Sequence, residues 1–385
     1  MRYLSKLGVR EVRALQDKIV LLRCDLNVPL VNGKITDDRK IRESVATIRM
    51  LLSFGCRVII ITHLGEPKGV DSALSSKVLL GSLSLRLKKK VMFSTLADLK
   101  KGSFGISCGF DVVLLENIRF DSREVAGDIG FARELVLLGD VYVNDAFAVS
   151  HRAHASVSLL PTLLPSYGGL LLEKEVTALS QGLSSGRGVQ RGSVWVIGGA
   201  KLSKIGIILS ALKNAEHVLL GGALCLPLIN PWGVDVETLG LVAKLRASRG
   251  FSKVVLPVDF NCLDKMTGKV RVVEADLIDD SVFAYDIGPA TVALFSQYVH
   301  GAKTVVWNGP LGYFEKKPFH IGTKKVLGSI RSGTVAICGG GETSEAVRVL
   351  RLGSKFTHIS TGGGASLAFL SGEKMPGLVG LEKSG

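Results

Sequence analysis

Several features that would assign a function directly are scarce or missing in this 385-residue chain. It has no GxxxxGK(S/T) phosphate-binding loop and no apolar run long enough to span a membrane. Its six cysteines form no CxxC pair and have no histidine at metal-ligand spacing, so no structural zinc site is expected. Aromatic residues make up only 6% and charged residues 21% of the chain, whereas 46% is hydrophobic. These values indicate a globular protein of two or three domains and argue against a disordered or membrane-spanning one.

The charge balance is strongly positive, with a formal net charge of +14. Binding to nucleic acid and binding of an anionic substrate both explain such an excess. The basic residues are dispersed, and only Lys88-Lys89-Lys90 forms a run, with no aromatic residues between its members. Nucleic-acid binding is therefore the weaker alternative. Because several cysteines lie inside apolar runs, we expect buried thiols and a reducing cytoplasmic location. The basic N-terminus contains Glu11 and leads directly into a strand, so it is interpreted as mature structure.

Short apolar runs in the first half are each followed by polar residues. Near-continuous apolar strands alternating with helices are typical of a parallel sheet buried on both faces. In such sheets ligands bind outside the carboxyl ends of the strands, so we predict an anion site there. The predicted strands are 19–22, 58–62, 112–115 and 140–143, with a helix over 41–52, and the polar residues after the strands are Asp25, Asn27, His63, Asn117, Arg119, Asn144, Asp145 and then Arg152.

In the second half, glycine follows most of the strands. The Gly/Ser-rich stretch 181–192 is the best candidate for a domain boundary. Glycine lets the backbone approach a ligand closely, and the N–H groups of a following helix bind phosphate, so this half is predicted to hold a nucleotide. Glu342 stands where it could hold magnesium bound to phosphate. The strands expected here are 194–197, which leads through Gly198-Gly199 to Lys201 and Lys204, and then 218–220, 254–258, 304–307, 334–338 and 356–360.

Along almost its whole length the chain resembles the phosphoglycerate kinase family. The motifs that carry the resemblance occur in order as RCDLNVP, THLGEPKG, LLENIRF, VNDAF, SHRAHAS, LLLEKEV, VIGGAKLSKI, LPVDF, DIGPAT, WNGPLGYFE, GGGETS and STGGGASLAFL. The resemblance implies an α/β fold of two doubly wound parallel-sheet, Rossmann-like domains joined by a hinge helix. It places a phosphoglycerate-binding domain at 1–168, the hinge helix and linker at 169–192, a nucleotide-binding domain at 193–370, and a tail at 371–385 that returns to the N-terminal domain.

The same resemblance implies a phosphotransferase with a carboxyl group as acceptor. Such an enzyme moves a phosphoryl group reversibly between 1,3-bisphosphoglycerate and ADP, giving 3-phosphoglycerate and ATP in glycolysis or gluconeogenesis. Mg²⁺ is the implied cofactor, with ATP or ADP as co-substrate. A cytoplasmic monomer with small-molecule partners and neither membrane nor nucleic-acid partners is expected.

Roles for individual residues follow from the motif match alone. The implied substrate-binding residues are Asp25, Leu26, Asn27, Lys40, His63, Leu64, Gly65, Glu66, Arg119 and Arg152. The implied nucleotide residues are Gly199, Lys201, Lys204, Ala284, Asn308, Glu315 (on the ribose), Gly340, Gly341, Glu342 and Thr343, with Glu342 also on the metal. The implied catalytic residues are Lys201, Lys40, Arg39, Gly340 and Gly363.

The chain departs from the family pattern at several of these positions. The family's catalytic arginine after GKIT aligns with Lys40, whose neighbour is Arg39, and a lysine keeps the charge but loses the two-pronged guanidinium. Glu66 replaces the arginine of HLGRP, Glu342 replaces an aspartate, and Ala284 replaces a common glycine. One residue is missing between Lys201 and Lys204. These changes leave a second alternative open, a degenerate homologue that binds nucleotide and turns over poorly.

Overall fold

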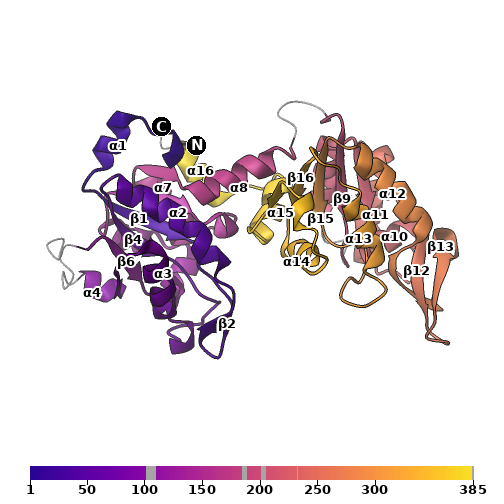
Figure 1. Ribbon diagram of the computed structural model, residues 1–385, viewed down its shortest axis with the longest axis horizontal. Helices are drawn as coiled ribbons and strands as arrows, with labels where there is room; N and C mark the ends of the chain where they lie inside the picture. Colours follow the sequence, from indigo (N-terminus) through magenta and orange to yellow (C-terminus); the bar gives the residue numbers. More distant parts are fainter. Residues whose placement is uncertain (101–109, 184–188, 201–204, 232, 384–385) are drawn as a thin grey trace. The chain divides into compact units, whose positions relative to one another are not determined.

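The computed structural model describes residues 1–100, 110–183, 189–200, 205–231 and 233–383 (Figure 1). The chain forms two compact units. Unit 1 contains Met1–Val176 and the C-terminal residues from Lys374, and unit 2 contains Thr177–Glu373. The division falls inside α8 (Leu170–Ser180), the helix expected as the hinge, so both units include part of it. Each unit is built around its own parallel sheet, and the architecture is α/β.

Unit 1 contains a six-stranded parallel sheet in the order β5-β6-β4-β1-β7-β8. Its strands are β1 (Ile19–Cys24), β4 (Arg57–Ile61), β5 (Val91–Ser94), β6 (Val112–Leu115), β7 (Val141–Asp145) and β8 (Ser166–Gly168), with a separate hairpin of β2 (Leu30–Val31) and β3 (Lys34–Ile35). Its helices are α1 (Val9–Leu15), α2 (Arg39–Ser53), α3 (Leu80–Leu87), α4 (Leu96–Lys100), α5 (Ser122–Ala126), α6 (Ile129–Val136), α7 (Leu160–Leu163) and α16 (Pro376–Lys383). The four strands expected from the sequence are all present, and β5 and β8 were not predicted.

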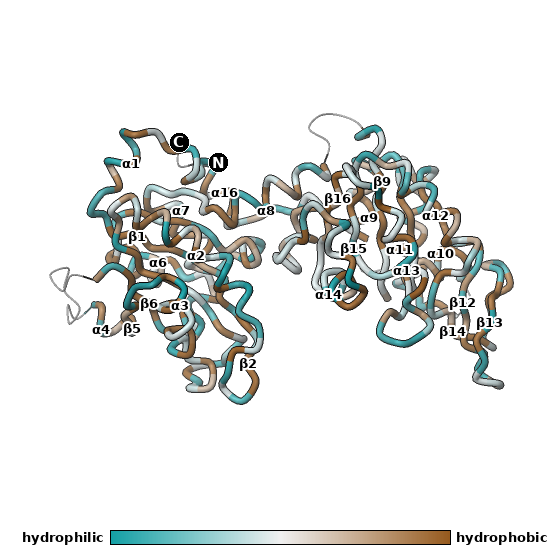
Figure 2. Tube along the Cα trace, viewed as in Figure 1, coloured by the Kyte–Doolittle hydropathy of each residue, from teal (hydrophilic) through white to brown (hydrophobic). Residues whose placement is uncertain are grey.

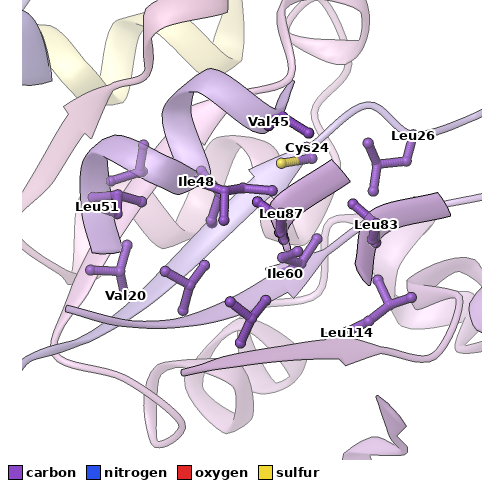
Figure 3. Close-up of a cluster of buried hydrophobic side chains, with 14 of the residues drawn as sticks. Val20, Cys24, Leu26, Val45, Ile48, Leu51, Ile60, Leu83, Leu87 and Leu114 are labelled. Carbon is purple, nitrogen blue, oxygen red and sulfur yellow. The ribbon is translucent and has the colours of Figure 1, made fainter. Parts of the chain in front are cut away.

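Alternate residues of β1 pack on opposite faces of this sheet, as the period-two geometry of a strand requires. Val20, Leu22 and Cys24 join a core with Ile48 and other residues of α2 and α3 (Figure 3), whereas Leu21 packs on the other face with residues of α6. Since every residue of β1 is buried, both faces are covered by helices. Figure 2 shows the resulting contrast, with hydrophobic residues along the central strands and hydrophilic residues predominating in the outer loops.

Unit 2 repeats the arrangement with the strand order β11-β10-β9-β15-β16-β17, all parallel. From β9 the chain continues to β10 and β11 on one side of the sheet, and β15, β16 and β17 follow in order on the other side. The strand order therefore reverses between β9 and β15. The strands are β9 (Ser193–Ile197), β10 (His217–Leu220), β11 (Val254–Val255), β15 (Thr304–Asn308), β16 (Val335–Cys338) and β17 (His358–Ile359). The helices are α9 (Ile205–Asn214), α10 (Leu226–Ile229), α11 (Val236–Arg246), α12 (Pro289–Gly301), α13 (Ile321–Gly328), α14 (Gly341–Val349) and α15 (Gly364–Leu370).

Two strand predictions in unit 2 are wrong in their extent. The run 356–360 was expected to be a strand, but only His358–Ile359 pairs with β16. The run 254–258 was expected to be a parallel strand, but only Val254–Val255 pairs with β10. The chain then enters an antiparallel sheet in the order β13-β12-β14, formed by β12 (Asp259–Asp264), β13 (Val270–Glu274) and β14 (Val282–Ile287). Asp259 therefore does not lie at the carboxyl end of the main sheet. Its carboxylate accepts hydrogen bonds from Ala290 N (2.9 Å) and Thr291 N (2.7 Å) and so caps α12.

The C-terminal helix α16 packs within unit 1. Gly377 N donates to Ser150 O (2.9 Å), and Asn144 Nδ2 donates to Gly377 O (3.1 Å). A Cβ added at Gly377 would lie 2.8 Å from a Val157 methyl carbon, so only glycine permits this close approach. Within the described parts of the chain, no helix is long and apolar enough to cross a membrane.

Candidate functional sites

The candidate anion site of unit 1 begins where β1 and β4 end. Asp25 directly follows β1 and is 5% exposed, and its Oδ2 accepts a 2.6 Å hydrogen bond from Lys40 Nζ at the start of α2. Asp25 Oδ1 also accepts from Asn27 N (3.1 Å). Asn27 Oδ1 in turn accepts from Gly65 N (2.9 Å), which fixes the loop after β4. The two loops are therefore held together by their own polar groups.

Lys40 and its neighbour Arg39 occupy different surroundings. The Lys40 side chain is 30% exposed and bonded to Asp25, whereas the Arg39 guanidinium is 50% exposed and lies 3.8 Å from Asp37 Oδ2. Successive residues of a helix project about 100° apart, so only one of the two can face Asp25. The sequence left this choice open, and the structure places Lys40 at the cluster.

His63, which follows β4, is held by a buried arginine that the site prediction did not include. His63 is 2% exposed, and its Nδ1 lies 3.2 Å from Nη2 of the fully buried Arg23. Since an arginine can only donate, Nδ1 accepts and the proton of the neutral ring resides on Nε2. Burial first, and then the positive charges of Arg23, Arg119 and Lys40, hold the pKa of His63 well below its ordinary value of 6.5. The ring is consequently neutral near pH 7 and has one N–H to donate.

Arg119 follows β6 and supplies a buried positive charge. It is 8% exposed, and its Nη1 donates to Gly65 O (2.8 Å) and lies 3.8 Å from Glu66 Oε1. Burial, followed by the charge of Arg23, lowers its pKa. Its Nε is buried without a hydrogen-bond partner in the described structure. The Glu66 side chain, which is 85% exposed, therefore lies beside Arg119. Arg152 is exposed and lies two residues before the buried His154 in the sequence.

Several polar residues at the strand ends make their hydrogen bonds within the fold of unit 1. Asn117, Asn144 and Asp145 are 2%, 0% and 0% exposed, and their hydrogen bonds are made inside the fold. Asn117 Nδ2 donates to Leu64 O (2.8 Å), and Asp145 Oδ1 accepts from Leu171 N (2.9 Å) and Leu172 N (3.2 Å) at the start of α8. Burial raises the pKa of Asp145 to about 7. These three residues therefore hold the surrounding loops together, and their part in the anion site stays a prediction. Leu26 and Leu64 likewise direct their side chains into the core.

The buried His154 makes the stability of unit 1 depend on pH. Burial, aided by the charges of Arg119, Arg23 and Arg152, lowers its pKa to about 4, and Glu124 Oε1 lies 4.0 Å from its Nδ1. Between pH 6.5 and 4 the unfolded chain therefore binds a proton that the folded chain does not, so folding stability falls as the pH falls through this window. We expect His154→Asn to reduce this loss by about 2 kcal/mol, as measured by urea unfolding at pH 7.5 and 4.5. An unchanged difference between the two pH values would contradict this assignment.

The candidate nucleotide site of unit 2 lies where the strand order reverses. Gly198 follows β9 and Gly309 follows β15, and the two backbones meet: Gly198 N donates to Asn308 O (2.8 Å) and Gly199 N donates to Pro310 O (2.9 Å). A Cβ on Gly198 would lie 2.1 Å from Pro310 O, and one on Gly309 would lie 2.1 Å from Gly198 O. Two adjacent strand ends can approach this closely only because neither residue has a side chain.

A cavity of about 310 Å³ opens beside this contact. Four of the predicted nucleotide residues line it, namely Gly199, Ala284, Glu315 and Glu342. The sequence prediction did not include the rest of the wall, which is formed by Ala200, Gly222, Ala223, Tyr285, Pro310, Gly312, Tyr313 and Phe314. The motif WNGPLGYFE contained the signal for part of this wall, because its proline and aromatic residues immediately precede Glu315.

Asn308 and Thr343 lie beneath the cavity and are 1% and 2% exposed. Thr343 Oγ1 donates to Gly339 O (2.8 Å) and accepts from Gly309 N (2.7 Å), and Asn308 Nδ2 donates to Gly339 O (2.6 Å). The Asn308 Oδ1 atom is buried without a hydrogen-bond partner in the described structure. These side chains therefore hold the glycine loops in position.

Gly340 and Gly363 occupy equivalent positions at helix starts. Gly340 (φ 96°) is the N-cap of α14, and Gly363 (φ 52°) is the N-cap of α15. The first N–H groups of a helix have no partner within that helix, and the helix dipole adds positive potential, so α14 presents an anion-binding end beside Gly341 and Glu342. Lys201 and Lys204, the predicted phosphate lysines, lie outside the described residues.

Chemically, unit 1 offers clustered positive charge together with the carboxylates of Asp25 and Glu66, and the positive charge suits a small polyanion. Unit 2 offers an apolar, aromatic-walled cavity beside a helix N-terminus, which suits a base and its phosphates. Within the described residues, no three His, Cys, Asp or Glu side chains lie close enough to one another to hold a metal ion.

Comparison with known proteins identifies one family. The sequence profile of the phosphoglycerate kinase family matches residues 9–373. The chain is 38% identical over 393 residues to phosphoglycerate kinase of Dictyoglomus turgidum, covering 96% of each chain, and 40% identical to that of Nautilia profundicola, covering 94% of this chain and 96% of the relative. Among solved structures, phosphoglycerate kinase from Coxiella burnetii matches with a TM-score of 0.88 and 31% identity, covering 98% of this chain and 99% of that one. The enzyme from Pyrococcus horikoshii matches with a TM-score of 0.79 and 28% identity, covering 100% and 99%.

Proposed function

The chain belongs to the phosphoglycerate kinase family, and from this premise we propose that unit 1 binds the phosphoglycerate and unit 2 binds the nucleotide. The protein is a phosphotransferase that moves a phosphoryl group reversibly between 1,3-bisphosphoglycerate and ADP, giving 3-phosphoglycerate and ATP. The family match supports this activity over the alternatives of a degenerate homologue or a nucleic-acid-binding protein. The observation that carries the division of substrates is that Gly199, Ala284, Glu315 and Glu342 line a single cavity.

In unit 1, positive charge holds the carboxylate and phosphate groups of the substrate. Arg119 and Arg152 supply guanidinium groups, His63 donates from Nε2, and Lys40 brings an ammonium that Asp25 orients. Phosphoryl transfer depends chiefly on positioning and on neutralising the charge of the transferred group, so cations in fixed positions are what the reaction needs. Asp25 and Asn27 hold the two loops in position without substrate. These loops therefore need to reorganise little when substrate binds.

In unit 2, the aromatic wall holds the base, Glu315 meets the ribose, and the N-terminus of α14 receives the phosphates. Gly340 and Gly341 allow the phosphates to approach the backbone N–H groups closely. Lys201 and Lys204 would add charge by motif match, although they lie outside the described residues. The buried contacts of Thr343 and Asn308 keep this loop in shape.

The carboxylate at the cavity fits a Mg²⁺ ion that binds together with the nucleotide. Mg²⁺ is commonly held by one or two carboxylates together with substrate phosphates and water, and Glu342 provides one exposed carboxylate at the cavity. Once bound, the ion would supply positive charge that neutralises the phosphates. Glu342 is the residue that would hold it.

Changing Glu342 to Gln is expected to raise the Mg²⁺ concentration needed for half-maximal rate by about tenfold, because an amide is a weaker ligand than a carboxylate. A Mg²⁺ titration at saturating substrates measures this shift. Glu345→Gln on the same helix is the matched control, because Glu345 pairs with Arg348 (Oε2 to Nε, 2.8 Å) and does not line the cavity. Equal shifts in the two variants would reject a metal role for Glu342.

A coupled assay with 1,3-bisphosphoglycerate, ADP and Mg²⁺ tests the activity directly, and ATP formation is expected.

The division of substrates is tested by Arg152→Ala, which should raise the KM for 3-phosphoglycerate in the reverse direction and leave the KM for ATP nearly unchanged. Equal increases in both would argue against separate sites. We also propose a cytoplasmic monomer, and the free, buried thiols of Cys24, Cys56, Cys225, Cys262 and Cys338 suit the reducing conditions of that compartment.

A further inference from the structure

A second cavity of about 740 Å³ adjoins the proposed nucleotide cavity in unit 2. The two share part of their walls, namely Ala223, Ala284 and Tyr285. Glu315, Glu342 and Gly199, which we assign to the ribose and phosphates, line only the first cavity. The shared wall is therefore at the base end of the proposed nucleotide site, and the second cavity continues beyond it.

The second cavity is largely apolar and partly aromatic. Leu226 and Ile229 of α10 form one side, and Phe283 on β14 forms another. Phe283 and Tyr285, two residues apart on the same face of β14, have nearly parallel rings with centroids 5.4 Å apart. Lys265 Nζ lies over the Phe283 ring, 4.6 Å from its centroid, and 45% of the residue is exposed. An exposed aromatic ring that lines a cavity favours contact with another ring.

The rim of the cavity is acidic and its framework is fixed. Asp279 and Asp280 both line it. Ser281 N donates to Asp279 Oδ1 (2.9 Å), and this bond together with that of the Ser281 hydroxyl lowers the pKa of Asp279, so its carboxylate remains charged. Asn230 Nδ2 donates to Ile278 O (2.8 Å), which ties the end of α10 to the rim. The charged residues that line the cavity are thus both acidic, which disfavours an anionic occupant such as a second phosphate, and the opposing charges nearby are Lys265 over Phe283 and Arg271 beside Asp279.

We propose that this second cavity is a base-side extension of the nucleotide site that accepts purine nucleoside diphosphates carrying an uncharged aromatic group on the exocyclic amine. The proposal rests on the proposed nucleotide site. In adenine the exocyclic amine lies at the edge remote from the ribose, so a base whose phosphates are at Glu342 directs that edge toward Ala223, Ala284 and Tyr285. A substituent on the amine then enters the second cavity and contacts Phe283, Leu226 and Ile229.

The experiment compares ADP with N6-benzyl-ADP, by calorimetric binding and by turnover with 1,3-bisphosphoglycerate. Burial of the benzyl group is expected to make the analogue bind about 3- to 30-fold more tightly than ADP. Two variants of residues that line only the second cavity should remove this gain while leaving the affinity for ADP within about twofold. Phe283→Ala removes the aromatic ring, and Ile229→Trp fills the space.

A charged analogue tests the acidic rim. N6-(4-carboxybenzyl)-ADP is expected to bind about fivefold or more weakly than N6-benzyl-ADP, because its carboxylate lies near Asp279 and Asp280. Asp280→Lys should abolish this difference. Asp276→Lys changes the net charge equally on the neighbouring turn but does not line the cavity, so it should leave the difference intact.

The outcomes separate the extension from the nucleotide site itself. Normal binding and turnover of ADP with N6-benzyl-ADP bound more than tenfold more weakly would overturn the extension and leave the proposed function standing. Failure of ADP itself to bind would overturn both. If the analogue binds tightly but Phe283→Ala and Ile229→Trp have no effect, the benzyl group lies elsewhere and the inference is wrong.

Discussion

Replacing Lys40 with alanine is expected to lower kcat about 100-fold or more, corresponding to about 3 kcal/mol of lost transition-state stabilisation. The ammonium of Lys40 lies 2.6 Å from Asp25 Oδ2 at the cluster that we assign to the substrate. Its removal takes away a positive charge held in position where the reaction needs charge to be neutralised. The measurement is steady-state turnover of 1,3-bisphosphoglycerate and ADP at saturating concentrations of both.

Arg39→Ala is the matched control, because it removes the same charge one residue away. The Arg39 guanidinium lies near Asp37 and is half exposed, so turnover should remain within about threefold of the parent. Lys40→Arg should keep most of the activity, since an arginine retains the charge and offers two parallel donors. A larger loss for Arg39→Ala than for Lys40→Ala would reverse the assignment of the two residues.

The second large effect is expected on stability, from Gly309→Ala. Gly309 has φ 91°, and an added Cβ would lie 2.1 Å from Gly198 O and 2.4 Å from Gly198 C. Backbone atoms of a central strand end cannot move aside as a side chain does. The overlap and the unfavourable φ together should destabilise unit 2 by about 4 kcal/mol and distort the nucleotide cavity. Urea unfolding and calorimetric ADP binding measure the two consequences.

Gly240→Ala on the exposed surface of α11 controls for the general effect of replacing glycine. No atom lies within 4 Å of a Cβ added there, and the residue is helical, so the change should stabilise the protein by about 0.5–1 kcal/mol. If Gly309→Ala unfolds at the parental urea concentration and binds ADP normally, the close approach of the two strand ends does not constrain the site.

Much of the architecture was predictable, because buried parallel strands carry a strong local signal. The apolar runs around Leu21, Val113 and Val196 all became central or near-central strands, since a strand covered by helices on both faces must be apolar throughout. The antiparallel sheet was missed because β13 is mostly exposed, so its residues do not show the same apolar continuity. The prediction of strand 254–258 failed because the chain turns away after Val255, and Pro257, which cannot donate a backbone hydrogen bond within a sheet, was the overlooked sequence signal.

The candidate sites show the same division between local and nonlocal information. Motif matching named Asp25, His63 and Arg119, but it could not show which strand-end residues are tied into the fold by internal hydrogen bonds, as Asn117 and Asp145 are. This depends on burial and on hydrogen-bond partners distant in sequence, for example the bond between Asn117 and Leu64. The site prediction did not include Arg23 for the same reason, because Arg23 and its contact His63 are 40 residues apart in the sequence.

By itself, the sequence determined the fold class, the family and the kinds of residue at each strand end, because apolar periodicity and ordered motifs are properties of the linear chain. The tertiary structure decided that Lys40 rather than Arg39 meets Asp25 and that His63 is neutral with its proton on Nε2. It also decided that the cavity we assign to the nucleotide shares Tyr285 with a second cavity. Each of these depends on distances between residues brought together by folding, where burial and neighbouring charge set the chemistry of a side chain.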